Sequence, residues 1–387
     1  MAPTSIVAPT NVEAPTFVGW DQVGADERVA FFEEIQRAFR NAATAVGEIK
    51  HTIQIADATI QLQFAGSPLA DRMMRTLSHL TVPNGPCPDL TIMLFDSQST
   101  HTRLRPLAGD VVERLKIWGG TGRLLTGRRE VIPLCDNRIR TTYRPGPRLL
   151  NVIDLETNQA VYWIEDVEDF PYYMRSYPLT FILGHWLRKR GLTIVHSAVI
   201  GSAENGILLT NKGSSGKSTT VLNSVQAGLN VLGDDYCALS IAQEKVVAHS
   251  LFNIVKIKTP QAQARFFPRM QPMIDNWNAF QREEEVALIS LQAHFPTRIQ
   301  SAMPIKAIVV PVVVSGQSTT TIKPISRATA LSALAPSSLT QMAANNQSAF
   351  RIMGQLVRRL PCYALQLGAD IDAIPCKIER FLAEQTG

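Results

Sequence analysis

The sequence predicts an α/β fold in which a smaller α+β domain precedes a larger α/β domain. The chain of 387 residues is long enough for two domains. Its 45% hydrophobic and 18% charged residues are sufficient to form buried cores. Strand-like and helix-like segments through its second half predict a mixed sheet covered by helices. We expect a leader over residues 1–18, the α+β domain over 19–172 and the α/β domain over 173–387.

The leader is rich in Pro, Ala, Thr and Val, and Ala-Pro-Thr recurs from Ala2, Ala8 and Ala14. Such a segment buries too little apolar surface to fold, so we expect it to be disordered. It lacks a basic region followed by an apolar core, and we therefore do not expect a secretory signal.

The α+β domain begins with a helical pattern, because apolar residues recur at helical spacing over residues 26–49. Residues 51–64 and 90–95 predict strands, because their apolar residues alternate with polar ones or follow one another without interruption. Residues 149–165 resemble a hairpin that turns at 156–158. No motif indicates the role of this domain, and substrate recognition stays open as one role.

Basic side chains are concentrated between residues 103 and 148, although the net charge of the chain is only +5. This basic strip could dock an acidic or phosphorylated substrate, form an ordinary solvated surface or bind nucleic acid. A solvated surface is favoured, and nucleic acid is the least favoured because no nucleic-acid motif accompanies the strip. Its members are Arg103, Arg105, Arg114, Lys116, Arg123, Arg128, Arg129, Arg138, Arg140, Arg144 and Arg148.

The α/β domain begins after a linker and helix predicted over residues 171–190, with the boundary near Tyr172. Residues 206–210 predict a buried strand, and residues 218–227 predict a helix that ends before Gly228. The glycine-rich turn between them has the order of a phosphate-binding loop, in which backbone N–H groups and a helix N-terminus surround phosphate oxygens. The expected nucleotide contacts are Gly213, Ser214, Ser215, Gly216, Lys217, Ser218 and Thr219.

Two side chains of this loop have expected roles. Lys217 would neutralise the β- and γ-phosphates, and Ser218 would hold Mg²⁺. The loop starts with Asn211 where the usual pattern has glycine, and asparagine tolerates left-handed backbone angles better than most residues. A chance glycine-rich turn is the alternative, and the flanking strand and helix argue against it.

An acidic pair follows the next strand, which is predicted over residues 229–232. Gly233, Asp234 and Asp235 come at its carboxyl end, where open α/β sheets place ligand chemistry. One carboxylate could complete the Mg²⁺ shell while the other accepts a proton from a hydroxyl group. An ordinary Asp-rich turn is the alternative.

His196 lies in the apolar run 192–200, which predicts one central strand. A histidine at this position could orient or tune a catalytic carboxylate. A hydrogen-bonded core histidine is the more common alternative.

These segments together resemble the catalytic domain of HPr kinase/phosphorylase. The resemblance rests on Val195 and His196, on the loop end Gly216-Lys217-Ser218-Thr219 and on residues 227–235 (AGLNVLGDD). It is closer still to a diverged branch of HPr-kinase-like serine kinases, which includes enzymes that phosphorylate lasso-peptide precursors. It implies a P-loop kinase domain of the phosphoenolpyruvate-carboxykinase-like class over residues 173–387.

The resemblance also implies a role for each site residue. Asp234 takes the position of the general base, contacted by His196, and Asp235 that of its metal-binding partner. The implied catalytic residues are Asp234, His196 and Lys217, and the implied metal ligands are Ser218 and Asp235. Thr219 stands where bifunctional HPr kinases carry glutamate, and no segment matches their downstream arginine-bearing loop. The reverse, dephosphorylating activity is therefore not expected.

Further elements complete the predicted sheet. Residues 250–258 predict a strand that brings Lys256 and Lys258 to the rim of the site, where they could meet phosphates, although solvated lysines are favoured. Residues 305–314 predict a core strand, too short to span a membrane. A last strand is predicted over 362–367, and helices over 327–334, 350–360 and 371–384.

We therefore expect an ATP- and Mg²⁺-dependent kinase that phosphorylates a hydroxyl group, the serine of a small protein or peptide such as an HPr-like protein or a ribosomal or lasso-peptide precursor. A metabolite kinase and a nucleotide-sensing P-loop protein without phosphotransfer are the alternatives. Five cysteines without C-x-x-C spacing predict reduced thiols in a cytoplasmic protein. No membrane partner is expected, and a homo-oligomer stays open.

Overall fold

The computed structural model describes residues 23–83, 85, 87–102, 104, 125–242, 245–258, 270–276, 286–341 and 346–385. The expected leader, residues 1–18, lies outside them. Part of the basic strip also lies outside them, namely Arg103, Arg105, Arg114, Lys116 and Arg123.

The chain forms two compact units. Unit 1 ends at Trp186 and unit 2 continues from Leu187, and the short segments Ile55–Asp57 and Arg75–Leu80 also belong to unit 2. This division falls inside helix α6 (Thr180–Lys189), later than the boundary near Tyr172 that the sequence predicts.

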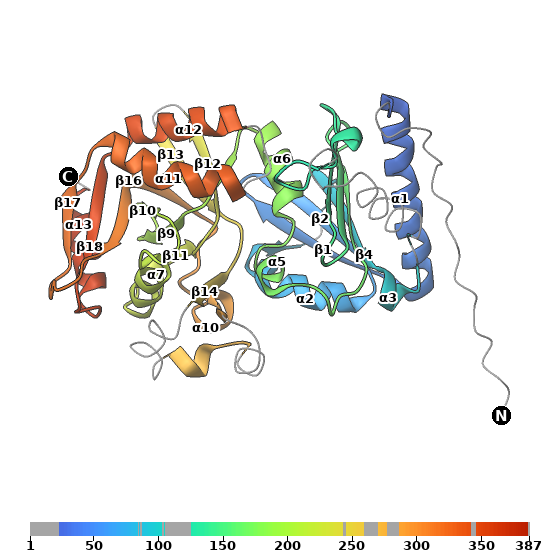
Figure 1. Ribbon diagram of the computed structural model, residues 1–387. Helices are drawn as coiled ribbons and strands as arrows, with labels where there is room; N and C mark the ends of the chain where they lie inside the picture. Colours follow the sequence, from blue (N-terminus) through green and yellow to red (C-terminus); the bar gives the residue numbers. More distant parts are fainter. Residues whose placement is uncertain are drawn as a thin grey trace. The chain divides into compact units, whose positions relative to one another are not determined.

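Unit 1 contains a mixed sheet of strands β1 Glu48–Ile55, β2 Ala58–Ala65, β3 Thr81–Val82, β4 Leu90–Asp96, β5 Ile139–Arg144, β6 Leu149–Asp154 and β7 Gln159–Ile164. Their order is β3-β1-β2-β4-β7-β6-β5. Figure 1 labels β1, β2 and β4 of this sheet. β2, β4 and β7 are parallel, whereas β7, β6 and β5 are antiparallel. The predicted hairpin is confirmed as β6 and β7. The segment predicted over 51–64 is two strands, because the chain turns at Ala56 and Asp57.

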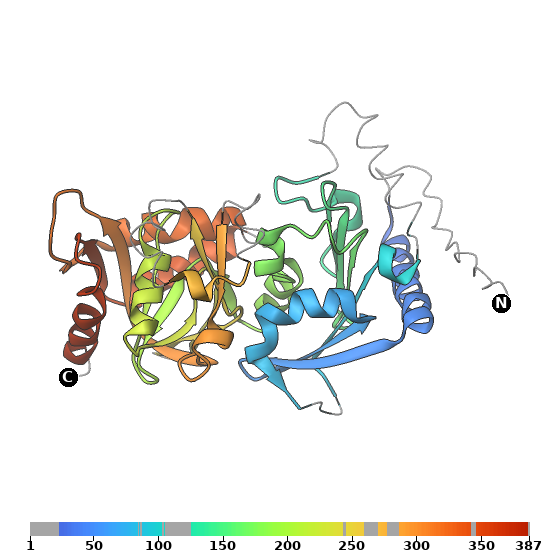
Figure 2. The ribbon, with the colours of Figure 1, turned by 90° about the horizontal axis from the view of Figure 1, so that it is seen from below.

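Helix α1 (Ala25–Val46) covers one face of this sheet (Figure 2). Phe31, Ile35 and Phe39, spaced four residues apart, belong to the same hydrophobic cluster as Trp163 of β7. They form the apolar stripe that the sequence predicts. The remaining helical segments before Leu187 are α2 Ser67–Leu77, η2 Ser78–Leu80, α3 Ser97–Thr100, η3 Ile132–Leu134 and α5 Tyr172–Ser176.

The described arginines of the basic strip include two that are paired with acids. The Arg138 guanidinium donates to Asp154 with an Nη2–Oδ2 distance of 2.8 Å. Arg140 forms an ion pair with Glu130. Sheet pairing brings these acids to the arginines from other positions in the chain, so the strip is less basic in the folded unit than its sequence suggests.

Unit 2 contains a branched mixed sheet and a separate antiparallel pair, β14 and β15. The path β11-β9-β10-β16-β13-β12-β8 is joined at β16 by β18, which also pairs with β17. The strands are β8 Thr193–Val195, β9 Ala198–Gly201, β10 Gly206–Leu209, β11 Asn230–Gly233, β12 Cys237–Ala242, β13 Lys245–Ser250, β14 Ile254–Lys258, β15 Val286–Ser290, β16 Ala302–Val313, β17 Thr321–Pro324 and β18 Cys362–Leu367. The mixed sheet and the predicted strands at 305–314 and 362–367 are confirmed.

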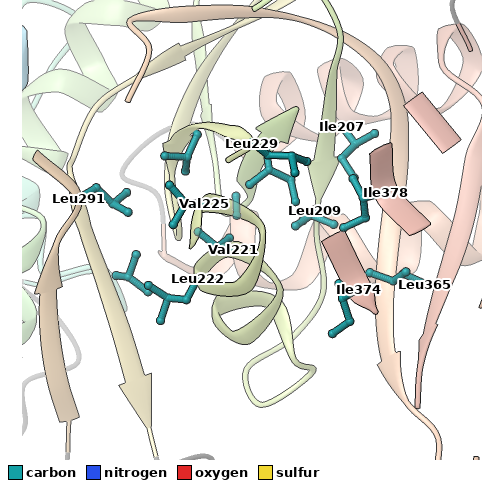
Figure 3. Close-up of a cluster of buried hydrophobic side chains, with 14 of the residues drawn as sticks. Ile207, Leu209, Val221, Leu222, Val225, Leu229, Leu291, Leu365, Ile374 and Ile378 are labelled. Carbon is teal, nitrogen blue, oxygen red and sulfur yellow. The ribbon is translucent and has the colours of Figure 1, made fainter. Parts of the chain in front are cut away.

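Helices cover both faces of this sheet. The helical segments after Leu187 in the described residues are α7 Lys217–Gln226, η4 Gln271–Met273, α10 Leu291–His294, α11 Arg327–Gln341, α12 Asn346–Arg359 and α13 Ile374–Glu384. Ile207 of β10 packs in a cluster with α7 and α13, and Leu208 packs in another with α11 and α12. Figure 3 shows Val221 of α7 and Ile378 of α13 in the first cluster. Because both faces are buried, the strands are apolar without alternation.

Candidate functional site

The turn between β10 and α7 has a backbone that restricts its residues. Gly216 has a φ of 93°, and Ser214 has a φ of 64°. A Cβ atom on Gly216 would lie 2.3 Å from Cδ1 of Leu367, so both the backbone and the available space require glycine. Gly213 and Ser214 are exposed, and the first N–H groups of α7 face this turn. Such a turn can surround an anion.

Asn211 holds the start of the loop through its side chain. Its Nδ2 donates to the carbonyl oxygen of Pro311 at 2.8 Å, and its Oδ1 accepts from the N–H of Lys212 at 2.8 Å. Asn211 is not among the residues with positive φ in the described part of the chain. The left-handed backbone expected there is therefore wrong, and the hydrogen bonds that tie the loop to β16 explain why asparagine fits this position.

The apolar run around His196 forms two strands rather than the one predicted. β8 pairs with β12, whereas β9 pairs with β10 and β11. His196 and Ser197 lie between the two strands and belong to neither. The His196 N–H donates to Oγ of Ser338 at 3.0 Å, and its ring packs edge-on against Tyr236. The change of strand partners thus places a buried imidazole beside the carboxyl end of β11.

Asp234 is buried next to the first turn of α7, with 1% of its surface exposed. Ser218 Oγ donates to its Oδ2 at 2.7 Å, and the Lys256 N–H donates to the same oxygen at 3.4 Å. Its Oδ1 is buried and has no hydrogen-bond partner in the described structure. Burial, together with the charge of Asp235, raises the pKa of Asp234 to about 7. A proton or a cation at this carboxylate would relieve the cost of its burial.

Asp235 is surrounded by basic groups. Its Oδ1 lies 3.1 Å from Nζ of Lys217 and 3.4 Å from Nε2 of His196. Its Oδ2 lies 3.2 Å from Nζ of Lys256. Burial alone would raise the pKa of Asp235, but these three neighbours outweigh burial and hold it well below its usual value. Burial also lowers the pKa of His196, which favours the neutral imidazole.

The neighbours of Asp234 and Asp235 differ from those that the sequence predicts. The sequence predicts a contact between His196 and Asp234, whereas the imidazole lies against Asp235. It also pairs Ser218 with Asp235, whereas the hydroxyl group binds Asp234. The chain bends at Asp234 and Asp235 after the end of β11. One carboxylate thereby faces Ser218, and the other faces Lys217 and His196.

Ser218 and Asp234 fit one side of a magnesium shell. Hydroxyl and carboxylate oxygens are hard ligands, and Mg²⁺ is usually held by one or two carboxylates together with phosphates of a substrate. The unpartnered Oδ1 of Asp234 is an available ligand atom. In the part of the chain that the structure describes, no group of three or more His, Cys, Asp or Glu side chains could hold a metal.

Lys256 is the site residue that the sequence underestimates. The sequence favours a solvated lysine, but only 13% of this side chain is exposed and its Nζ binds Asp235. Its neighbours Val255 and Ile257 are buried in the hydrophobic core of unit 2. Alternation along a strand therefore directs Lys256 to the other face, toward the acidic pair. This alternation is the only sequence signal for its position.

Comparison with known proteins adds little to this geometry. The chain matches no protein-family model, and no curated protein matches it. It is similar to the structure of the Hpr(Ser) kinase/phosphatase from Coxiella burnetii, with 10% identity and a TM-score of 0.29, over 50% of this chain and 99% of that chain. A likeness of that size carries no argument about family or activity. None of the helices in the described ranges is long and apolar enough to cross a membrane.

Proposed function

We propose that the protein is an ATP- and Mg²⁺-dependent kinase that transfers the γ-phosphoryl group to a hydroxyl group, the serine of a small protein or peptide. One observation carries the proposal. Lys217 and Ser218, adjacent in the loop, contact different members of the acidic pair, at 3.1 and 2.7 Å. A glycine-rich loop whose lysine and serine lie beside two carboxylates brings together the groups that phosphoryl transfer uses to bind phosphates, hold a metal ion and accept a proton.

The loop would bind the nucleotide. The exposed Gly213 and Ser214, together with the N-terminus of α7, would contact the phosphate oxygens. Lys217 would exchange its single carboxylate partner for the more highly charged triphosphate. Ser218 and Asp234 would hold Mg²⁺, which supplies charge neutralisation at the β- and γ-phosphates when bound.

We assign Asp235 as the proton acceptor, because Asp234 faces Ser218 and His196 contacts Asp235. When Lys217 turns to the phosphates, it no longer depresses the pKa of Asp235, and the carboxylate becomes a stronger base. The hydroxyl proton moves to Asp235 as the hydroxyl oxygen bonds to the γ-phosphorus. The bond from that phosphorus to the β–γ bridging oxygen breaks, and ADP leaves.

The class of acceptor and the location rest on separate observations. The resemblance of residues 195–236 to HPr-kinase-like serine kinases supports serine, in an HPr-like protein or in a ribosomal or lasso-peptide precursor. All five cysteines are free, which agrees with a reducing, cytoplasmic compartment.

The test is transfer of label from γ-labelled ATP with Mg²⁺ into a lysate of the source cells, separated by size. The wild-type protein should label a small protein or peptide. Asp235→Asn should keep its affinity for ATP and transfer label about 10²- to 10⁴-fold more slowly. Lys217→Ala should weaken both ATP binding and transfer. Asp71→Asn is the matched control, because this carboxylate is exposed on α2.

The other outcomes separate the alternatives. Label in a small molecule alone would indicate a metabolite kinase. Binding of ATP without transfer, or with transfer to water only, would indicate a nucleotide-sensing protein and would contradict the proposal. If Asp234→Asn lost transfer but kept Mg²⁺-dependent ATP binding, while Asp235→Asn remained active, the base would be Asp234.

A further inference from the structure

The range of residues 286–369 contains no Asp or Glu. It includes the whole of β15, β16, β17, α11, α12 and β18. This part of unit 2 therefore carries positive charge without an acid of its own to balance it. Its basic residues are Arg298, Lys306, Lys323, Arg327, Arg351, Arg358 and Arg359.

Helix α12 presents part of this charge on the side that faces away from the sheet. Met353 and Leu356 pack in the hydrophobic cluster beneath the helix. Arg351 and Arg358 are exposed and seven residues apart, which places them on one side of the helix, about 10 Å apart along its axis. Arg358 Nη2 lies 3.9 Å from the position that a Cβ atom of Gly354 would take. Its guanidinium group therefore lies back along the helix toward Arg351.

Neighbouring elements do not balance these two arginines. The cluster beneath α12 is formed with β8, β9, β10, β11, β12, β13, β16, α11 and β18, and none of these elements contains an Asp or Glu within its bounds. Among the residues that the structure describes, neither Arg351 nor Arg358 forms an ion pair. Their charges are therefore available to an anion from outside the chain.

The side chains on α11 and α12 are of the kinds that polypeptide partners contact. Phe350 is 49% exposed, and it is the only aromatic one among the large apolar side chains that are exposed in the described part of the chain. Both helices carry arginine, and neither contains lysine. Protein interfaces are enriched in arginine and aromatic residues and depleted in lysine. We call Phe350, Arg351 and Arg358 the α12 surface, and its composition favours a polypeptide over a nucleic acid.

The α12 surface begins at the end of the helical pair that lies beside the candidate site. The His196 N–H donates to Oγ of Ser338 in α11 at 3.0 Å, and the His196 ring contacts Asp235. α12 begins five residues after α11 ends, and the two helices lie side by side (Figure 1). Helices with so short a connection run antiparallel. Phe350 and Arg351 are therefore at the same end of the pair as Ser338.

We propose that the α12 surface docks an acidic segment of the acceptor polypeptide, while a serine elsewhere in that polypeptide reaches Asp235. This inference rests on the proposed function and names the chemistry of the acceptor. Carboxylates of the segment pair with Arg351 and Arg358, and an apolar side chain covers Phe350. Because these contacts are remote from the reacting atoms, they bind the acceptor equally before and during transfer. They should therefore lower the KM for the acceptor without changing kcat.

The experiment measures binding of two fluorescent peptides to the purified full-length protein by anisotropy. Each peptide contains a serine and a leucine, and a run of glutamates in the first is replaced by lysines in the second. The wild type should bind the glutamate peptide about 10-fold more tightly than the lysine peptide, and the double variant Arg351→Glu/Arg358→Glu should reverse this preference. Arg298→Glu/Lys323→Glu is the matched control, because both residues are exposed, lie in the same acid-free range and are outside α12. It should keep the preference of the wild type.

Two further measurements separate docking from a structural role. Phe350→Ser should weaken binding of the glutamate peptide about 5- to 30-fold at every salt concentration, whereas the effect of Arg351→Gln/Arg358→Gln should shrink as salt is added. With the labelled lysate fraction as acceptor, Arg351→Gln/Arg358→Gln should raise KM about 10-fold and leave kcat and the affinity for ATP unchanged. A variant that merely disturbed the fold would change all three.

Equal binding of the glutamate peptide by the wild type and by Arg351→Glu/Arg358→Glu would overturn the docking role of the α12 surface. A single-stranded oligonucleotide that bound the wild type more tightly than the glutamate peptide, and lost binding in the same variant, would also overturn it, because the partner would then be a nucleic acid. A wild type that binds the glutamate peptide as expected, yet binds ATP without transferring label, would instead refute the proposed kinase.

Discussion

Unit 1 and unit 2 each contain a cluster of acidic and basic side chains, and the clusters differ in how completely their carboxylate oxygens are hydrogen-bonded. In unit 1, the Arg138 guanidinium binds Asp154 at two points, through Nε at 3.1 Å and Nη2 at 2.8 Å. Arg140 and His185 both contact Glu130. Such two-point contacts are specific in geometry, and they connect neighbouring parts of the sheet.

In unit 2, two adjacent carboxylates lie beside two lysines, and one carboxylate oxygen accepts no hydrogen bond within the described structure. Asp235 is shared by two lysines, while Asp234 keeps a buried oxygen without a hydrogen-bond partner among the residues described. The difference teaches that the density of charge along the sequence does not locate a functional site. Carboxylates whose oxygens are all hydrogen-bonded stabilise a fold, whereas a buried carboxylate oxygen that accepts no hydrogen bond can take up a cation.

The largest expected difference between the two clusters is in the Mg²⁺ concentration that ATP binding requires. Asp234→Asn should raise the Mg²⁺ concentration needed for half-maximal ATP binding by about 10³-fold, roughly 4 kcal/mol, because it removes a charged ligand. Titration of Mg²⁺ at fixed ATP measures this. Asp154→Asn, which changes an equally buried carboxylate in unit 1, should leave the Mg²⁺ requirement unchanged. If the wild type, Asp234→Asn and Asp154→Asn needed the same Mg²⁺ concentration, the two clusters would not differ in metal binding.

The next effect concerns the stability of unit 1. Glu130→Gln should reduce the free energy of unfolding at pH 7 by about 3 kcal/mol, because it leaves Arg140 without its carboxylate. Burial raises the pKa of Glu130, but hydrogen bonds from His185 and Arg140 outweigh burial and lower it from 4.5 to about 2. The stabilisation is therefore complete above pH 4.5 and is lost as the pH falls toward 2.

Urea unfolding at pH 7, 4 and 3 measures this pH dependence. The difference between the wild type and Glu130→Gln should shrink with each step down in pH. Glu48→Gln, in which the acid belongs to a partly exposed pair with Lys50, should show little difference at any pH. A difference for Glu130→Gln that does not change with pH would mean that the ion pair is not its cause.

A smaller effect tests the backbone of the loop. Gly216→Ala should destabilise the protein by about 1–3 kcal/mol and weaken ATP binding, because alanine is strained at φ 93° and its Cβ meets Leu367. Gly127→Ala is a control outside the loop, since an added Cβ there also has no neighbour within 4 Å. Thermal unfolding and ATP titration compare the two variants. Equal behaviour would contradict the assigned loop geometry.

The smallest expected effect belongs to the exposed edge of unit 1. Arg148 Nη1 lies 3.9 Å from Glu165 Oε2, and the Arg148 side chain is 57% exposed. Arg148→Gln should therefore change the unfolding free energy by less than about 0.5 kcal/mol. Urea unfolding measures this change. If Arg148→Gln lowered the free energy of unfolding as much as Glu130→Gln does, exposure would not explain the difference between the two ion pairs.

The sequence predicted the elements that depend on local patterns. The strand, turn and helix around Lys217 lie where the order of apolar residues and glycines placed them, and so does α1. The break at His196 was not predictable, because strands buried on both faces form continuous apolar runs. It arises because β8 and β9 pair with different strands on either side of it.

The sequence by itself determined where the glycine-rich loop, the acidic pair and most helices and strands lie along the chain. These features depend on residues that are close in sequence, so spacing and periodicity suffice to predict them. Only the tertiary structure decided that His196 and Lys256 meet Asp235 rather than Asp234, and that Arg138 and Arg140 are paired. Alternation along a strand indicates which face a side chain takes, as at Lys256, but not which partner it meets there. Ion pairs depend on which strands become neighbours, and that is not encoded in the spacing of residues along the chain.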